Sequence, residues 1–259
     1  LPHVIQKFYV VPKTSDARWS VVWGLFFISV LYWFAPVYSA LGKVMSSHPD
    51  IGALSKDAIV VYTAQLGEVH PWIVGFLAAG AVSAAFSTVS GLLVAGASAF
   101  SHDLYHKVFR PEASGEMQMK MAQLGTILMA VGVMIVALFK LALIAQLVAT
   151  AFSLAGCTLF PLFLLGIWWS GSNRAGATAG LATGLGVSLL AIAYFVAGKF
   201  QIDLPGKDMI TYWVNPWYFA WFGAPLSIIV HIIVAKMTEP TPEDVKKFLA
   251  VNVHGVKAD

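Results

Sequence analysis

Hydroxyl side chains are concentrated in one apolar stretch of the sequence, residues 78–105. Almost all polar atoms there are hydroxyl oxygens, those of Ser83, Ser87, Thr88, Ser90 and Ser98. A helix that faces lipid gains nothing from them, whereas a helix packed against other helices uses small side chains for close approach. Hydroxyl oxygens are also weak, uncharged ligands for a hard cation. The stretch predicts a membrane helix with a site that can release its ion.

A second apolar run, residues 143–169, carries a polar stripe. Gln146, Thr150 and Ser153 recur at helical spacing, and Cys157 and Thr158 continue the series. Residues three or four positions apart share one face of a helix, so the first three can line a cavity for a solute. The alternative, for this stripe as for the hydroxyls of the first stretch, is that Ser and Thr bond to their own helix and pack.

The elements that must position these residues are membrane-spanning helices. Hydrophobic residues make up 58% of the 259 and charged ones 11%, and the mean hydropathy is +0.76. A helix needs about 20 apolar residues to cross a bilayer. Six runs are long enough, and the sequence therefore predicts an all-α polytopic membrane protein; the runs are 19–45, 72–100, 121–139, 143–169, 175–198 and 217–235.

Basic residues predict the orientation. Eleven flank one side of the predicted helices and five the other: Lys7, Lys13, Arg18, Lys107, Arg110, Lys120, Arg174, Lys236, Lys246, Lys247 and Lys257, against Lys43, Lys56, Lys140, Lys199 and Lys207. The positive-inside rule then places both ends of the chain in the cytoplasm. The inner (plasma) membrane is the expected location. Topogenic charge accounts for the net charge of +3, so no nucleic-acid partner is expected.

The polar composition after Ala235 predicts a boundary between a membrane domain, residues 1–236, and a cytoplasmic tail, residues 237–259, with a short amphipathic helix. Residues 57–65 are expected to form a short surface helix. The opening, LPHVIQKFYVVPKTSDARWS, is more typical of an internal loop than of a start. We therefore expect a portion of a longer polypeptide.

Enzyme chemistry finds no support, because the sequence contains no P-loop, GxSxG, HExxH or Cys/His cluster. Cys157 is expected to be a packed small residue. His231, inside the last run, is either a proton carrier or, as we expect, packed against a neighbour's hydroxyl. Asp103 lies in the SHDLY turn, where its helix leaves the membrane at His102; it is either a proton or ion relay or, as we expect, a capping or salt-bridging residue. Arg174 either binds an anion or, as we expect, anchors the interface.

Three motifs in order resemble the sodium/solute symporter family, with the acetate and short-chain monocarboxylate permeases as the most similar branch. They are LPHVIQKFYVVP, AFSTVSGLLVAGASAFSHDLY and FPLFLLGIWWSGSNRAGATAG. The resemblance implies a LeuT-like fold of two inverted five-helix repeats. The first four runs would be core helices seven to ten, and the last two would be peripheral. The broken first and sixth core helices would then lie in a missing N-terminal half, on the same chain or a separate one.

The same resemblance implies an ion site and a solute. In the family, sodium is held by two adjacent hydroxyl residues on the eighth core helix, a carbonyl three positions earlier and carbonyls of the first helix; the matching residues here are Ala84, Ser87 and Thr88. The tenth core helix lines the solute cavity. Sugar-transporting members use amides there, where this chain has ATAFS at 149–153. Sodium symport of a small organic anion such as acetate is expected; the alternatives are a solute-sensing domain of a signalling protein and a non-transporting structural subunit.

Overall fold

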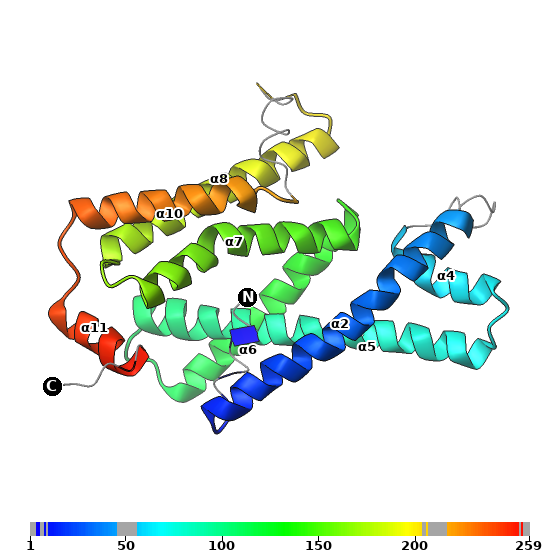
Figure 1. Cartoon of the computed structure of the whole chain (residues 1–259), viewed down its shortest axis with the longest axis horizontal. Coiled ribbons are helices and arrows are strands. Elements are labelled where there is room, and N and C mark those ends of the chain that lie inside the picture. Colours follow the sequence, from blue (N-terminus) through cyan, green and yellow to red (C-terminus); the bar gives the residue numbers. More distant parts are fainter. Residues whose placement is uncertain are drawn as a thin grey trace. The chain divides into compact units, whose positions relative to one another are not determined.

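The computed structural model describes residues 4–5, 8, 10–45, 56–203, 206, 217–253 and 255. All their secondary-structure elements are helical, which confirms the all-α prediction (Figure 1). The chain divides into two compact units, Pro2–Lys140 and Leu141–Asp259, and each is described by itself. The elements are α2 (Thr14–Met45), η1 (Lys56–Ala58), α4 (Ile59–Leu66), α5 (Pro71–Ser98), η2 (Ala99–Phe109), α6 (Gly115–Leu138), α7 (Ile144–Trp168), α8 (Arg174–Lys199), α10 (Ala220–Met237), α11 (Glu243–Phe248) and η3 (Leu249–Val253).

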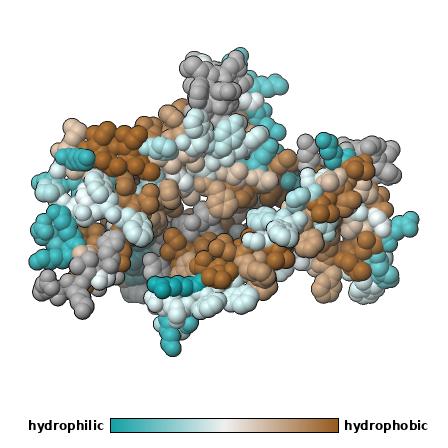
Figure 2. Space-filling view, viewed as in Figure 1, coloured by the Kyte–Doolittle hydropathy of each residue, from teal (hydrophilic) through white to brown (hydrophobic). Residues whose placement is uncertain are grey.

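Six helical segments of the described residues are long and apolar enough to span a membrane. They are α2, α5 continued by η2, α6, α7, α8 and α10. Each overlaps one of the six predicted runs. Apolar side chains lie on the surface rather than in a core, Trp33 and Phe76 being 83% exposed, and Figure 2 shows apolar residues over much of the visible face. Apolar surfaces of this kind are expected where lipid or other membrane helices surround a helix.

Polar residues set where several of these helices begin. Ser114 precedes α6, and its hydroxyl accepts a hydrogen bond from the Met117 N–H at 3.4 Å. Asn173 precedes α8, and its Oδ1 accepts one from the Gly176 N–H at 2.8 Å. Each side chain satisfies a donor that the first helical turn leaves without a partner. Within the spans the helix itself pairs the backbone, which a bilayer requires.

In the unit Pro2–Lys140, α5 and its continuation η2 pack against α6 through small residues. A Cβ built at Gly96 would lie 2.9 Å from Met129 Cε, and one at Gly125 would lie 2.8 Å from Phe100 Cδ1. Glycine therefore lets each helix accept a large side chain of the other. The predicted surface helix over 57–65 is present as η1 and α4, which packs against α2.

The end of the hydroxyl-rich helix differs from the prediction. The sequence predicts a turn around Asp103. The structure instead continues α5 directly into the π-helix η2 as far as Phe109. Polar side chains do not end a helix when they can project outward and pair with one another, as Asp103 does with His102 and Lys107. Asp103 is thus a salt-bridging residue, as expected, although not in a turn.

In the unit Leu141–Asp259, α7, α8 and α10 form a three-helix core. Small residues recur along the buried face of α8 at Gly176, Gly180, Gly184, Ser188 and Ala191. This repeat of about four residues lets the backbones approach closely. At the centre lie the fully buried side chains of Cys157, Ala191 and Phe219, which confirms that Cys157 is a packed small residue.

After α10 the chain turns into α11, extended by η3 (Figure 1). This is the short helix predicted for the tail over 237–259, of which residues 254 and 256–259 lie outside the described residues. Lys7, Lys207 and Lys257 of the orientation count also lie outside them. The cytoplasmic placement of the tail and the inverted-repeat arrangement stay predictions.

Candidate functional site

The predicted ion ligands lie on one exposed face in the middle of α5. Thr88 Oγ1 donates a hydrogen bond to the Ala84 carbonyl oxygen at 3.2 Å. The Ser87 carbonyl oxygen accepts one from Ser90 Oγ at 3.0 Å, whereas the Ser87 hydroxyl has no partner among the described residues. Ala84, Ser87 and Thr88 are all exposed. The structure thus brings a hydroxyl and a carbonyl oxygen of this set together on one helix turn.

This arrangement leaves the oxygens able to bind a cation. A hydroxyl that donates its hydrogen still has lone pairs on its oxygen. The Ala84 carbonyl oxygen accepts the Thr88 hydroxyl and also the backbone N–H of its own helix, so the Thr88 hydroxyl must turn away before that carbonyl oxygen can bind a cation. The bond from Thr88 to Ala84 is at the same time the back-bonding that a threonine makes in many membrane helices. The described residues contain no group of three or more His, Cys, Asp or Glu side chains that could hold a metal ion. The ligands available on α5 are accordingly neutral.

The predicted solute residues lie on α7, in the other unit. Gln146 Oε1 accepts a hydrogen bond from the Leu143 N–H at 3.1 Å and so caps the start of the helix. Thr150 Oγ1 donates to the Gln146 carbonyl oxygen at 2.9 Å, and both side chains are half-buried. The buried Ser153 donates across to the Trp217 carbonyl oxygen at 3.0 Å. Ser153 therefore joins α7 to the segment that leads into α10.

The rest of the polar stripe on α7 faces the neighbouring helices. Cys157 and Thr158 are buried, and Thr158 Oγ1 donates to the Leu154 carbonyl oxygen at 2.7 Å. A Cβ added at Gly223 of α10 would collide with the Cys157 sulfur. This end of the stripe is a packing face, which helical spacing alone does not distinguish from a cavity wall.

A set of hydrogen bonds joins the start of α8 to the end of α10, and the sequence predicted only the one at His231. Asn173 Nδ2 lies within hydrogen-bond distance of the Ala235 carbonyl oxygen (3.1 Å), Thr238 Oγ1 (2.9 Å) and the Glu239 carbonyl oxygen (2.6 Å), and its two hydrogens are shared among these three acceptors. Ser172 Oγ lies 2.9 Å from Nε2 of His231, which is 1% exposed. The prediction that His231 packs against a hydroxyl is confirmed. The SGSN turn was the available signal, since Asn and Ser cap helices and bond to nearby backbone.

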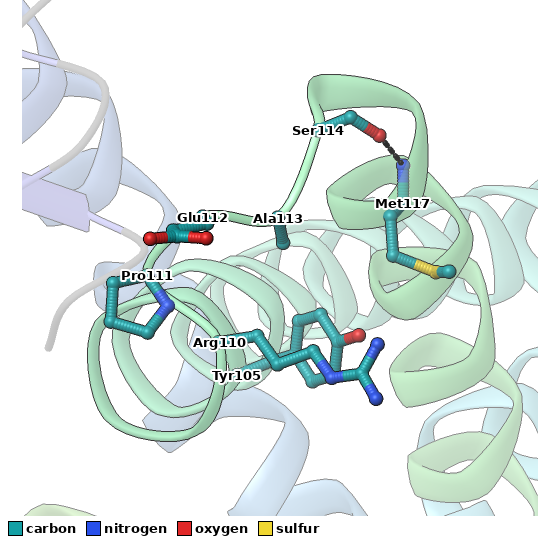
Figure 3. Close-up of a pocket in the computed structure, with 7 residues that line it drawn as sticks. All are labelled: Tyr105, Arg110, Pro111, Glu112, Ala113, Ser114 and Met117. Atoms are coloured by element: carbon teal, nitrogen blue, oxygen red, sulfur yellow. Dashed lines mark hydrogen bonds between the residues drawn. The ribbon is translucent and has the colours of Figure 1, made fainter.

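A pocket of about 610 Å³ lies at the turn between η2 and α6 and includes none of the predicted residues. In Figure 3 the Arg110 guanidinium and the Tyr105 ring lie on one side of it, and Ser114 bonds to Met117 on another. Glu112 projects outward from the turn. The only feature of the sequence that could have indicated this pocket was the Arg-Pro-Glu turn after a long helix.

Comparisons with known proteins agree with the positions of the motifs. The profile of the sodium:solute symporter family matches residues 1–184, which include α5 and α7. The chain is also 30% identical over 278 aligned positions to an uncharacterized symporter of Cupriavidus necator; the match covers 92% of this chain and 40% of that protein. The chain thus spans two fifths of the length of this curated relative. No solved structure matches the chain. The match to the family profile, together with this relative, shows that the chain belongs to the sodium:solute symporter family.

Proposed function

We propose that the chain is part of a transporter in which sodium flowing into the cell drives uptake of a small monocarboxylate such as acetate. The family supports coupling of sodium to a solute in general terms. Sodium is here a co-substrate that must be bound and released in each cycle. The proposal assigns its ligands on this chain to the Ala84 carbonyl oxygen and the hydroxyls of Ser87 and Thr88.

One observation carries this proposal. Thr88 Oγ1 and the Ala84 carbonyl oxygen lie 3.2 Å apart on an exposed face of α5. None of the 18 residues in the most apolar part of this helical segment is buried. A cation between them and the Ser87 hydroxyl would still need further ligands. A facing helix, as the family places there, would supply them and cover the hydroxyls. Neutral oxygens hold sodium weakly enough for release, and each inward charge contributes about 2.3 kcal/mol per 100 mV of membrane potential.

The test is the sodium dependence of solute uptake by the intact protein. Replacing Ser87 and Thr88 together by Ala should raise the sodium concentration for half-maximal uptake at least tenfold, because each lost ligand costs about 1 kcal/mol. Thr126→Ala is the matched control, since Thr126 Oγ1 makes the same kind of back-bond, to the Ala122 carbonyl oxygen at 2.9 Å, on α6. An unchanged sodium dependence in the double variant, at normal expression, would reject the site.

The solute assignment rests on the chemistry of α7. α7 contains no Asp or Glu, and the NH₂ group of Gln146 can donate hydrogen bonds to a solute. Thr150 can do so when its hydroxyl turns from the Gln146 carbonyl oxygen toward the solute. A carboxylate would be repelled by an acid and accepts hydrogen bonds from hydroxyls and amides. The run Ala149–Ser153 lacks the amides with which sugar-transporting members bind their polyhydroxylated solutes. A small anion with a single carboxylate is therefore the solute class that we propose.

Uptake of labelled acids tests this assignment. Labelled acetate, propionate or pyruvate should accumulate in cells only when sodium is higher outside. Thr150→Leu should lower uptake about fivefold to 150-fold, because the added bulk fills the space and removes a hydrogen-bond partner, a loss of roughly 1 to 3 kcal/mol. Accumulation of proline or a sugar, and of none of the three acids, would refute the monocarboxylate assignment and leave the sodium site untouched.

A further inference from the structure

An apolar groove lies where α8 begins and α10 ends. Its volume is about 830 Å³, which is within the range of about 300 to 1,000 Å³ typical of ligand sites. One wall is the first three turns of α8, with Ala175, Ala179 and Ala182. The other wall is the link after α10, with Pro240 and Pro242. Because α8 and α10 are both membrane-spanning candidates, the groove lies at the ends of two candidate spans, where a membrane–water interface is expected.

The groove carries one positive and one negative side chain. Arg174 and Glu239 both line it, and neither forms an ion pair within the described part of the chain. Arg174 is the first residue of α8. A positive charge there is opposed by the helix dipole, which favours anions at this end. The combined field of Arg174 and the helix start attracts an anionic group, and the Glu239 carboxylate attracts a cationic one.

The link that forms the second wall is held in place by hydrogen bonds. Asn173 Nδ2 donates to the Glu239 carbonyl oxygen at 2.6 Å, and Thr241 Oγ1 donates to the Ser172 carbonyl oxygen at 2.9 Å. These bonds join the residues on either side of Pro240 to the start of α8. These hydrogen bonds therefore hold the groove in shape and fix the backbone that carries Arg174 and Glu239.

We propose that this groove binds a membrane phospholipid whose headgroup contains both a phosphate and a primary ammonium, as in phosphatidylethanolamine. The phosphate would bind Arg174, the ammonium would bind Glu239, and an acyl chain would lie along Ala175, Ala179 and Ala182. Charge complementarity selects this occupant. A headgroup with only a negative charge would be repelled by Glu239, and the quaternary ammonium of phosphatidylcholine has no hydrogen to donate to the carboxylate.

Native mass spectrometry of the purified protein tests this proposal with three lipids of matched acyl chains. Phosphatidylethanolamine should give at least five times as much adduct as phosphatidylcholine or phosphatidylglycerol at equal concentration. Arg174→Gln and Glu239→Gln should each bring phosphatidylethanolamine down to the level of phosphatidylcholine. Lys236→Gln is the matched control, because it removes a charge at the same end of α10 outside the groove and should leave the preference unchanged.

Two further variants separate lipid binding from folding. Ala179→Leu should lower binding of all three lipids by filling the groove, and Arg174→Lys should retain part of the preference because it keeps the charge. Equal binding of the three lipids by the unaltered protein would overturn the proposal. So would a preference for phosphatidylglycerol that depends on Arg174 alone, or a Lys236→Gln effect as large as that of Arg174→Gln.

Discussion

Gly184 of α8 offers a sharp test of the three-helix core, because another glycine on the same helix is its control. A Cβ at Gly184 would overlap the Cys157 carbonyl group of α7, whereas a Cβ at Gly186 would meet nothing within 4 Å. The obstructing atoms at Gly184 are backbone atoms in the middle of a helix, so they cannot rotate away as a side chain can. Gly184→Ala and Gly186→Ala should therefore change stability in opposite directions.

The magnitudes follow from two opposing terms. Replacing glycine by alanine inside a helix stabilises it by up to about 1 kcal/mol, which is the whole expected effect at Gly186. Overpacking a close contact costs about 1 to 3 kcal/mol, and this term applies at Gly184 alone. The two variants should therefore differ by about 1 to 3 kcal/mol. At about 2 to 4 °C per kcal/mol for chains of 150–250 residues, the melting temperatures should differ by several degrees.

Cys157 provides the assay. It is the single cysteine of the sequence and is fully buried between α7, α8 and α10. A thiol-reactive fluorophore should label it in detergent only when heating separates these helices, so the labelling midpoint reports the stability of this core. Equal midpoints for the two alanine variants would refute the close approach of α8 to α7. Labelling of the unheated, unaltered protein would refute the burial of Cys157.

Two other predictions concern the α8–α10 hydrogen bonds and the orientation. Asn173→Ala should destabilise this unit by about 2 to 3 kcal/mol, since it removes a helix cap and the bonds to Ala235 and Thr238. Asn173→Asp should restore the cap but not these bonds. Equal melting temperatures of the two variants would contradict a separate contribution of the cap. Cysteine at the exposed Val69 should react with an impermeant thiol reagent in intact cells, and cysteine at the exposed Glu112 should not. The reverse pattern would overturn the predicted orientation.

The sequence by itself determined the class and the spans of this protein. Apolar runs of about 20 residues dictate membrane helices, because a bilayer allows no unpaired backbone, and all six predicted runs coincide with helices. The helix ends were less predictable. The run ending at Phe100 continues as a helix to Phe109, since a hydropathy pattern registers polar side chains but not the ion pairs of Asp103 that a helix can accommodate.

Only the tertiary structure decided which distant residues the polar side chains bond to or pack against. Helical spacing placed Ser153 and Cys157 on the same stripe, but Ser153 bonds to the Trp217 carbonyl oxygen and Cys157 packs against Phe219. These partners lie more than 60 positions away in the chain, where no local pattern reaches. The same holds for Asn173 and for the groove between Arg174 and Glu239, because both depend on the end of α10 returning to the start of α8.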